Sequence, residues 1–213
     1  MKLVIATSNA GKLREMQALL SPVLSWEIVS LAEFLPFEMP PEDGKTMAEN
    51  ARIKAIFCMR KLKLPCLADD SGLEVDALNG EPGVHSARWH AGADADRNAA
   101  LLARLQDVPA NQRTARFRCA LCLAMSGEDL LEVEATCEGR IAIAPRGNNG
   151  FGYDPIFEIS DTSNSNPAVI GQTMAEVTSA QKAQLSHRAR AVTLLLERLP
   201  KSGYRCLTQN DNW

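Results

Sequence analysis

Short apolar runs alternate with helical patterns along this chain, and that alternation constrains its fold more than any other feature. A buried strand is predicted at 3–6, and a helix at 11–20 follows it directly. The clearest helix is predicted at 46–62, because Thr46 and Glu49 form a capping box ahead of a continuous apolar stripe. Further strands are expected at 26–29, 65–68, 114–125, 129–137 and 140–144. Further helices are expected at 94–106 and near the end of the chain, where one long helical pattern runs from Leu185 to Leu199. Helices interleaved with strands and one hairpin predict an α/β domain with a mixed sheet.

The length and charge of the chain exclude several classes of protein. With 213 residues it can form one large α/β domain or two small lobes. Its net charge of −3 argues against broad nucleic-acid binding, although positive charge gathered locally can still bind a small anion. No run approaches the ~20 consecutive apolar residues that a membrane span needs. We therefore expect a cytoplasmic protein with neither nucleic acid nor membrane as a partner.

The six cysteines are expected to be reduced thiols in that compartment. Cys119 and Cys122 form the one C-x-x-C pattern, and they fall within a predicted strand. Residues three apart on a strand point to opposite faces, so this pair is interpreted as buried small hydrophobes rather than a zinc or redox site.

The turn from Thr7 to Lys12 lies where a predicted strand ends and a helix begins. Exposed amides and the positive end of a helix suit a phosphate group, and Lys12 adds a full charge. The Walker A pattern is absent. The alternative is an ordinary Ser or Asn cap beside a surface lysine.

Asp69 and Asp70 follow an apolar run and are expected at the end of a strand, where ligands gather in open α/β sheets. Two adjacent anions repel unless a cation or proton intervenes, and Mg²⁺ prefers oxygen ligands of this kind. Glu38, Glu42 and Asp43, in a proline-rich loop, could supply another carboxylate. A solvated Asp turn is the alternative.

Three further sets of polar side chains are candidates for binding. Asn50 and Lys54 lie one helical turn apart, off the apolar stripe, unless they simply form a solvated face. The segment 147–157 contains glycines, which permit close approach of a flat ligand, and aromatic residues, which could stack on a base. The alternative is that these aromatic side chains fill the core. His187 and Arg188, near a helix start, carry anion-binding groups, or else form a polar helix face.

Five stretches, taken together and in this order, resemble the inosine triphosphate pyrophosphatase family, whose bacterial members are XTP/dITP pyrophosphatases. They are IATSNAGKLREM (5–16), TMAENARIKA (46–55), LADDSGLEVDALNGEPGVHSARW (67–89), GFGYDPIF (150–157) and SHRARA (186–191). The resemblance implies a long twisted mixed sheet flanked by helices, in two lobes with a cleft between them. It also implies a homodimer, with residues 1–199 as the domain and 200–213 as a C-terminal tail. The loop around 160–173 is longer than the usual family connection.

The activity implied by the resemblance is Mg²⁺-dependent hydrolysis of ITP, dITP and XTP to the nucleoside monophosphate and pyrophosphate. Asp69 is then the general base and a metal ligand, and Glu42 is the second metal carboxylate, with Glu38 as its alternative. The residues implied to bind substrate are Thr7, Ser8, Asn9, Ala10, Gly11, Lys12, Asn50, Lys54, Asp70, Ser71, Phe151, Gly152, Tyr153, Asp154, Lys182, His187 and Arg188. Two alternatives remain: a related pyrophosphatase acting on other modified nucleotides, and a nucleotide-binding module without catalysis.

Overall fold

A computed structural model describes residues 1–34, 36–125, 129–160 and 167–199, and the chain divides into two compact units. Unit 1 comprises Met1–Asp70, Ala120–Glu134 and the described residues from Ala191 onward. Unit 2 comprises Ser71–Cys119 and Ala135–Arg190. The predicted hairpin turn at 126–128, most of the 160–167 loop and the 200–213 tail lie outside the described residues.

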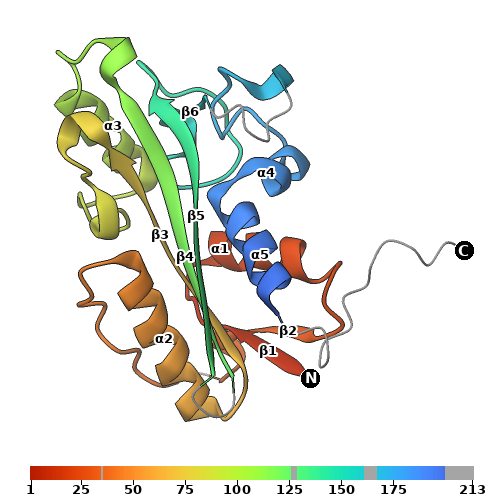
Figure 1. Cartoon of the computed structure of the whole chain (residues 1–213). Coiled ribbons are helices and arrows are strands. Elements are labelled where there is room, and N and C mark those ends of the chain that lie inside the picture. The colour runs from red at the N-terminus through yellow and green to blue at the C-terminus, as the bar shows by residue number, and fades with distance from the viewer. Residues whose placement is uncertain (35, 126–128, 161–166, 200–213) are drawn as a thin grey trace, which may run out of the picture. The chain divides into compact units, whose positions relative to one another are not determined.

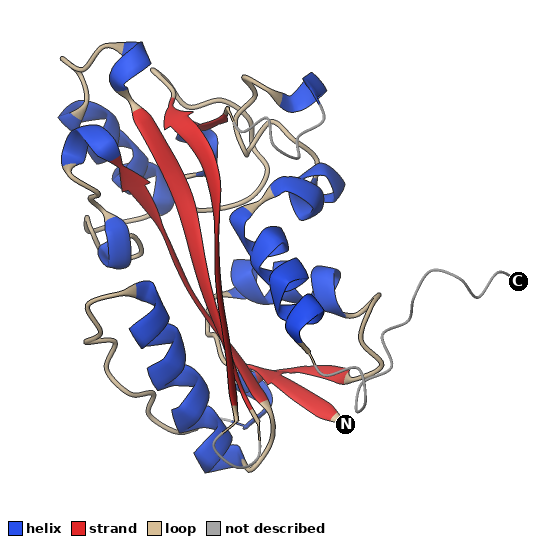
Figure 2. Ribbon diagram, in the orientation of Figure 1, coloured by secondary structure: helices blue, strands red, loops and turns tan. Residues whose placement is uncertain are grey.

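Six strands of the described chain form one mixed sheet in the order β2-β1-β3-β4-β5-β6 (Figures 1 and 2). β1 pairs in parallel with both β2 and β3, whereas β5 and β6 are antiparallel. The strands are β1 (Lys2–Ile5), β2 (Glu27–Ser30), β3 (Cys66–Val75), β4 (Thr114–Ala124), β5 (Leu130–Ile141) and β6 (Phe157–Ile159). The α/β class with a mixed sheet is therefore confirmed.

Five α-helices are found in the described part of the chain. They are α1 (Ala10–Leu20), α2 (Met47–Leu62), α3 (Asp94–Arg104), α4 (Ser179–Leu185) and α5 (His187–Arg198). Thr46 caps α2 as predicted, with its hydroxyl accepting from the Glu49 amide at 3.1 Å. The Glu49 carboxylate accepts from the Lys45 amide at 2.6 Å rather than from Thr46, so only half of the predicted box forms. None of the described helices combines the length and apolar character that crossing a bilayer requires.

Unit 1 is built around β1, whose apolar residues are buried between β2 and β3. Met16 and Leu20 of α1 and Ala51 and Ala55 of α2 are fully buried, as the helical spacing predicted. The five described cysteines are buried and form no disulfide with one another, and this burial confirms the interpretation of Cys119 and Cys122 as small core side chains. Burial raises the pKa of the Cys122 thiol to about 12, so it stays protonated and unreactive.

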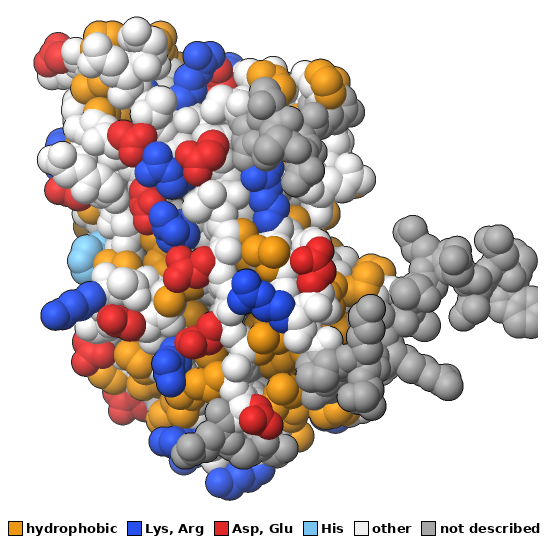
Figure 3. Space-filling model, viewed as in Figure 1, with side chains coloured by type: hydrophobic (Ala, Val, Ile, Leu, Met, Phe, Trp, Pro, Cys, Tyr) orange, Lys and Arg blue, Asp and Glu red, His pale blue; other side chains and the backbone are white. Residues whose placement is uncertain are grey.

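Opposite charges are interspersed over the face that Figure 3 presents. In unit 2, arginines of β4 form ion pairs with β3 and with the residue that follows it: Arg118 Nε lies 2.8 Å from Glu74 Oε1, and Arg116 Nη1 lies 3.0 Å from Asp76 Oδ1. These pairs join neighbouring strands through their side chains.

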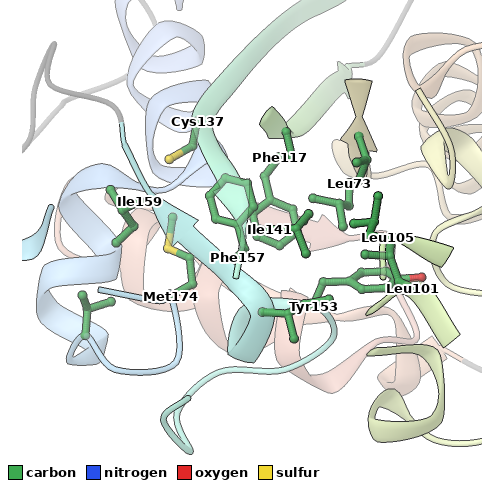
Figure 4. Close-up of a cluster of buried hydrophobic side chains, with 14 of the residues drawn as sticks. Leu73, Leu101, Leu105, Phe117, Cys137, Ile141, Tyr153, Phe157, Ile159 and Met174 are labelled. Atoms are coloured by element: carbon green, nitrogen blue, oxygen red, sulfur yellow. The ribbon is translucent and has the colours of Figure 1, made fainter. Parts of the chain in front are cut away.

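The core of unit 2 gathers side chains from α3, from β3, β4 and β5, and from the segments 153–159 and 169–185 (Figure 4). Phe117 of β4 and Phe157 of β6 lie at its centre, with ring centroids 4.4 Å apart. The labelled members are Leu73, Leu101, Leu105, Phe117, Cys137, Ile141, Tyr153, Phe157, Ile159 and Met174. Because the core includes Tyr153 and Phe157, it anchors the glycine-rich segment that precedes them.

Two predicted boundaries were wrong for reasons that only packing reveals. β5 runs without a break to Ile141, although two separate strands were predicted at 129–137 and 140–144. A Cβ at Gly139 would lie 2.4 Å from the backbone oxygen of Glu158, so this glycine permits close approach of β6 rather than ending the strand. The closing helical pattern is two helices, because Ser186 is extended (ψ 156°) and its hydroxyl accepts from the Ala189 amide at 3.2 Å to start α5.

Candidate active site

Two lysines and two aspartates form a buried cluster in unit 1, which we call the lysine–aspartate cluster. Lys12 Nζ, from the first turn of α1, lies 2.9 Å from Asp69 Oδ1. Lys54 Nζ, from α2, lies 2.9 Å from Asp70 Oδ1. Asp69 is only 1% exposed, so its charge requires a partner of opposite sign. The structure thus brings together four residues that the sequence placed in three separate motifs.

Lys54 is the centre of this cluster. Its Nζ also donates to the backbone oxygen of Asp69 at 2.9 Å and lies 3.0 Å from Glu42 Oε1. Burial alone lowers the pKa of Lys54, but the carboxylates of Asp70 and Glu42 outweigh burial and hold that pKa above its usual value. Lys54 therefore remains a cation at neutral pH, and Glu42 joins the cluster while Glu38 is exposed.

Asn50 lies on the same face of α2 as Lys54, one turn earlier. Its Nδ2 is 3.4 Å from Asp70 Oδ2, and its Oδ1 accepts from the Gly44 amide at 2.9 Å. Burial raises the pKa of Asp70, against the opposing pull of Lys54 and Lys12. The solvated-face interpretation of Asn50 and Lys54 was wrong, since both side chains are buried against β3.

Asp69 and Asp70 lie in the interior of β3, not at its end as predicted. The strand that ends beside this part of β3 is β1: Ile5 pairs with Leu67, and the Ala6 amide donates to the Leu67 oxygen at 2.8 Å. The Asp-Asp-Ser-Gly sequence suggested a turn, but cations compensate the buried carboxylates and allow the strand to continue.

The predicted phosphate turn follows β1 directly. Asn9 caps α1, its Oδ1 accepting from the Lys12 amide at 3.0 Å, and its own amide donates to Thr7 Oγ1 at 3.1 Å. Ser8, Asn9 and Ala10 are exposed. The turn therefore presents exposed backbone at a helix N-terminus, while the Lys12 side chain reaches Asp69.

A second group of predicted residues lies in unit 2, and we call it the Phe151 cluster. It consists of Ser71, Phe151, Asp154, Lys182 and Arg188. Lys182 Nζ donates to the Asp154 carboxylate and lies 5.0 Å from the centroid of the Phe151 ring. Arg188 Cζ is 5.9 Å from the same centroid, and its guanidinium donates to Ser71 Oγ at 2.8 Å. An aromatic face with two neighbouring cations can bind a planar group with polar edges.

Two predicted residues are buried away from this cluster's aromatic face. Tyr153 belongs to the core, and its hydroxyl donates to the Ser86 oxygen at 3.0 Å. Burial raises the pKa of Tyr153 to about 12. The His187 ring stacks on Phe117, with centroids 4.8 Å apart. Of the three aromatics in segment 147–157, Tyr153 and Phe157 fill the core, and Phe151 borders the cations.

Gly152 is held by two side chains of α3 that were not predicted as site residues. Its amide donates to Asp94 Oδ2 at 2.6 Å, and its carbonyl accepts from Asn98 Nδ2 at 3.1 Å. One signal was present in the sequence: Asn98 shares its helix face with Leu101 and Leu105, where an apolar residue is expected.

Comparison with known proteins gives consistent results. A family model described as the Ham1 family matches residues 3–198. A dITP/XTP pyrophosphatase of Geobacillus kaustophilus is 52% identical over 199 residues, covering 92% of this chain and 93% of the relative. A dITP/XTP pyrophosphatase of Thermus thermophilus is 46% identical over 198 residues, covering 92% of this chain and 91% of the relative.

Solved structures share the fold. The Staphylococcus aureus Ham1 protein superposes with a TM-score of 0.79 at 35% identity, covering 93% of this chain and 98% of that one. A HAM1 protein from Coxiella burnetii also gives 0.79, at 39% identity and with the same coverage. The family resemblance seen in the five sequence motifs is thereby confirmed.

Proposed function

This chain belongs to the Ham1 family, and from that membership we propose that it hydrolyses deaminated purine nucleoside triphosphates. The substrates are ITP, dITP and XTP, and the products are the nucleoside monophosphate and pyrophosphate. The observation that carries the proposal is the lysine–aspartate cluster, where the buried Lys54 and the half-buried Lys12 pair with two buried carboxylates beside an exposed helix N-terminus. The names of the similar relatives, dITP/XTP pyrophosphatases, support the substrate class.

The phosphates are assigned to unit 1. The helix N-terminus at the exposed residues 8–10 and the ammonium groups of Lys12 and Lys54 supply donors and positive charge for a triphosphate. Asp69 is assigned as the general base, which accepts a proton from the attacking water. Lys54 holds Asp70 and the Asp69 backbone together, so it positions the base as well as neutralising charge.

We assign a Mg²⁺ ion to Asp69 and Glu42. Carboxylate oxygens are the ligands this ion prefers, and one or two of them suffice when substrate phosphates and water complete the shell. Among the described residues, no group of three or more acidic, His or Cys side chains lies close enough together to hold a metal ion. When bound, the ion would neutralise charge on the phosphate oxygens.

The base is assigned to the Phe151 cluster in unit 2. Phe151 offers an aromatic face, and Lys182 and Arg188 offer donors to a 6-oxo group. Adenine carries an amino donor at that position, which leaves such donors unpaired and disfavours ATP. Ser71 and Asp154 hold the two cations in place.

Two further proposals come from the family resemblance. We assign the chain to a homodimer, for which light scattering would give a mass near twice 23.2 kDa. A mass of one chain in dilute solution would contradict it. We also place the protein in the cytoplasm, with the nucleotide pool that such an enzyme sanitises.

A product assay tests the proposed function. The purified protein is incubated with Mg²⁺ and, separately, ITP, dITP, XTP, ATP and GTP, and phosphate is measured with and without added inorganic pyrophosphatase. We expect phosphate from the first three substrates only when pyrophosphatase is present, and little from ATP or GTP. Phosphate released without it would contradict pyrophosphate as the product. Tight binding of ITP without any product would favour a non-catalytic module.

A further inference from the structure

The segment that carries Phe151 has unusual backbone freedom. Gly147, Gly150 and Gly152 all have positive φ, at 76°, 77° and 64°. Glycine adopts this conformation readily and leaves it as readily, so a segment with three such residues needs external contacts to stay in one conformation. Because Phe151 lies between two of these glycines, the contacts that hold the segment also place its ring against Lys182 and Arg188.

One face of α3 supplies contacts to both polar groups of Gly152. Asp94 Oδ2 accepts from the Gly152 amide at 2.6 Å, and Asn98 Nδ2 donates to the Gly152 carbonyl at 3.1 Å. Asp94 and Asn98 are four residues apart, so their side chains lie one above the other on the helix. Arg97 pairs with the other oxygen of Asp94 and donates to the Gly92 carbonyl at 2.8 Å, which restrains the Asp94 carboxylate.

Stability alone does not explain why a polar Asn occupies the buried position 98. It is 4% exposed and shares its helix face with the fully buried Leu101 and Leu105. Its Oδ1 accepts no hydrogen bond from any residue that the structure describes. A buried acceptor without a partner destabilises a fold, and an apolar side chain at this position would avoid that cost. The contact that an apolar side chain would lose is the one to Gly152.

We infer that Asp94 and Asn98 are positioning residues for base recognition, acting through Gly152 to fix Phe151 against Lys182 and Arg188. This inference rests on the proposed function for the identity of the ligand. That the contacts of Asp94 and Asn98 with Gly152 restrain segment 147–152 does not depend on the ligand, and this restraint can be measured without an activity assay.

Asp94→Ala is the main test, and Asp96→Ala is its matched control. Both aspartates lie in the first turn of α3 and interact similarly with the helix dipole. Asp96 Oδ2, however, accepts from the Ala93 amide at 2.8 Å and caps the helix without contacting Gly152. We expect Asp94→Ala to raise KM for ITP about tenfold with kcat changed less than about threefold, and Asp96→Ala to leave both nearly unchanged. Asp94→Asn keeps an acceptor oxygen and should recover most of the lost affinity.

Asn98→Leu separates positioning from folding. We expect its melting temperature to equal or exceed that of the wild type, because the unpaired oxygen is removed, while its KM for ITP rises severalfold. Calorimetry should show weaker binding of inosine monophosphate by Asp94→Ala, with binding of pyrophosphate unchanged. Equal KM increases in Asp94→Ala and Asp96→Ala, or no increase in either, would overturn the inference.

Hydrogen exchange of residues 147–154 distinguishes failure of this inference from failure of the proposed function. Faster exchange in Asp94→Ala than in Asp96→Ala supports the hold on Gly152. If the wild type releases no pyrophosphate from ITP but hydrogen exchange of residues 147–154 is faster in Asp94→Ala than in Asp96→Ala, the contacts of α3 with Gly152 are supported. Their role in base recognition is then contradicted. If the wild type is active and Asp94→Ala matches it in KM and exchange, the inference is wrong while the proposed function stands.

Discussion

At the scale of single residues, the chemistry of unit 1 depends on pairing each buried carboxylate with a lysine. Asp69 pairs with Lys12 and Asp70 with Lys54, each at 2.9 Å. Removing one member of such a pair leaves an uncompensated charge, which costs far more than the pair contributes. Asn is the substitution for Asp69 that keeps the shape of the side chain, and the Lys12 side chain whose partner carboxylate it removes is 15% exposed, so water can solvate that charge.

Asp69→Asn should keep the fold and lose about 10²-fold or more in kcat, because the amide cannot accept the proton of water. The measurement is pyrophosphate release from ITP, with circular dichroism to verify folding. Glu38→Gln is the control, since that side chain is exposed and should leave kcat unchanged. Near-normal turnover by folded Asp69→Asn protein would remove Asp69 from the role of base.

Lys54→Met should destabilise the protein by about 3 kcal/mol, because Asp70 would lose its buried cation. Urea unfolding at neutral pH measures this change. Lys61→Met, on an exposed position of the same helix, should change the free energy of unfolding by less than about 0.5 kcal/mol. If both variants are equally stable, the pair at Lys54 is not a structural requirement. The double variant Lys54→Met/Asp70→Asn should recover part of the loss.

At the scale of elements, charged side chains in unit 2 link β4 to the end of β3. Asp76, just after β3, accepts from Arg116 at 3.0 Å and from the Thr114 hydroxyl at 2.7 Å. These hydrogen bonds, that from Arg116 above all, lower the pKa of Asp76 below its usual value near 3.8. The ionised form is thus the one the folded protein favours.

Asp76→Asn should therefore show a pH-dependent loss of stability. A depressed pKa in the folded state contributes stability above the unfolded value, and that contribution is lost as pH falls through the folded pKa. We expect the wild type to exceed Asp76→Asn in free energy of unfolding at neutral pH, with the difference shrinking in acid. The carboxylate is substantially exposed, so the difference should be small. A difference independent of pH in urea titrations would contradict this account.

At the scale of the whole molecule, the family match and the predicted domain end at nearly the same residue. The family model stops at residue 198, and the predicted domain stops at 199. After residue 190, four apolar side chains of the described chain are buried: Ala191, Val192, Leu195 and Leu199. The end of α5 is therefore part of the folded domain.

Truncation after Leu199 should leave the free energy of unfolding and kcat/KM for ITP nearly unchanged. Truncation after Arg190 removes the four buried side chains and should cost more than about 4 kcal/mol, or prevent folding. Thermal unfolding and the pyrophosphate assay measure both variants. Loss of activity on removing only 200–213 would assign a function to the tail.

Much of the fold was predictable, because its signals are local. Thr46 caps α2 through the amide of a residue three positions away, and the apolar stripes of α1 and α2 follow from helical spacing. The candidate residues were also recognisable, since five motifs carried the family resemblance. Their partners were not recognisable, because Lys54 lies 15 residues from Asp69, and Asp94 lies 58 residues from Gly152.

The sequence by itself determined the elements whose interactions span a few residues, along with the family and the side chains able to do chemistry. Only the tertiary structure decided that β3 continues through Asp69 and Asp70, that Tyr153 lies in the core while Phe151 does not, and that α3 holds Gly152. The physical reason is the cost of burial. A carboxylate or a peptide group can be removed from water only where a partner satisfies it, and here those partners come from distant parts of the chain.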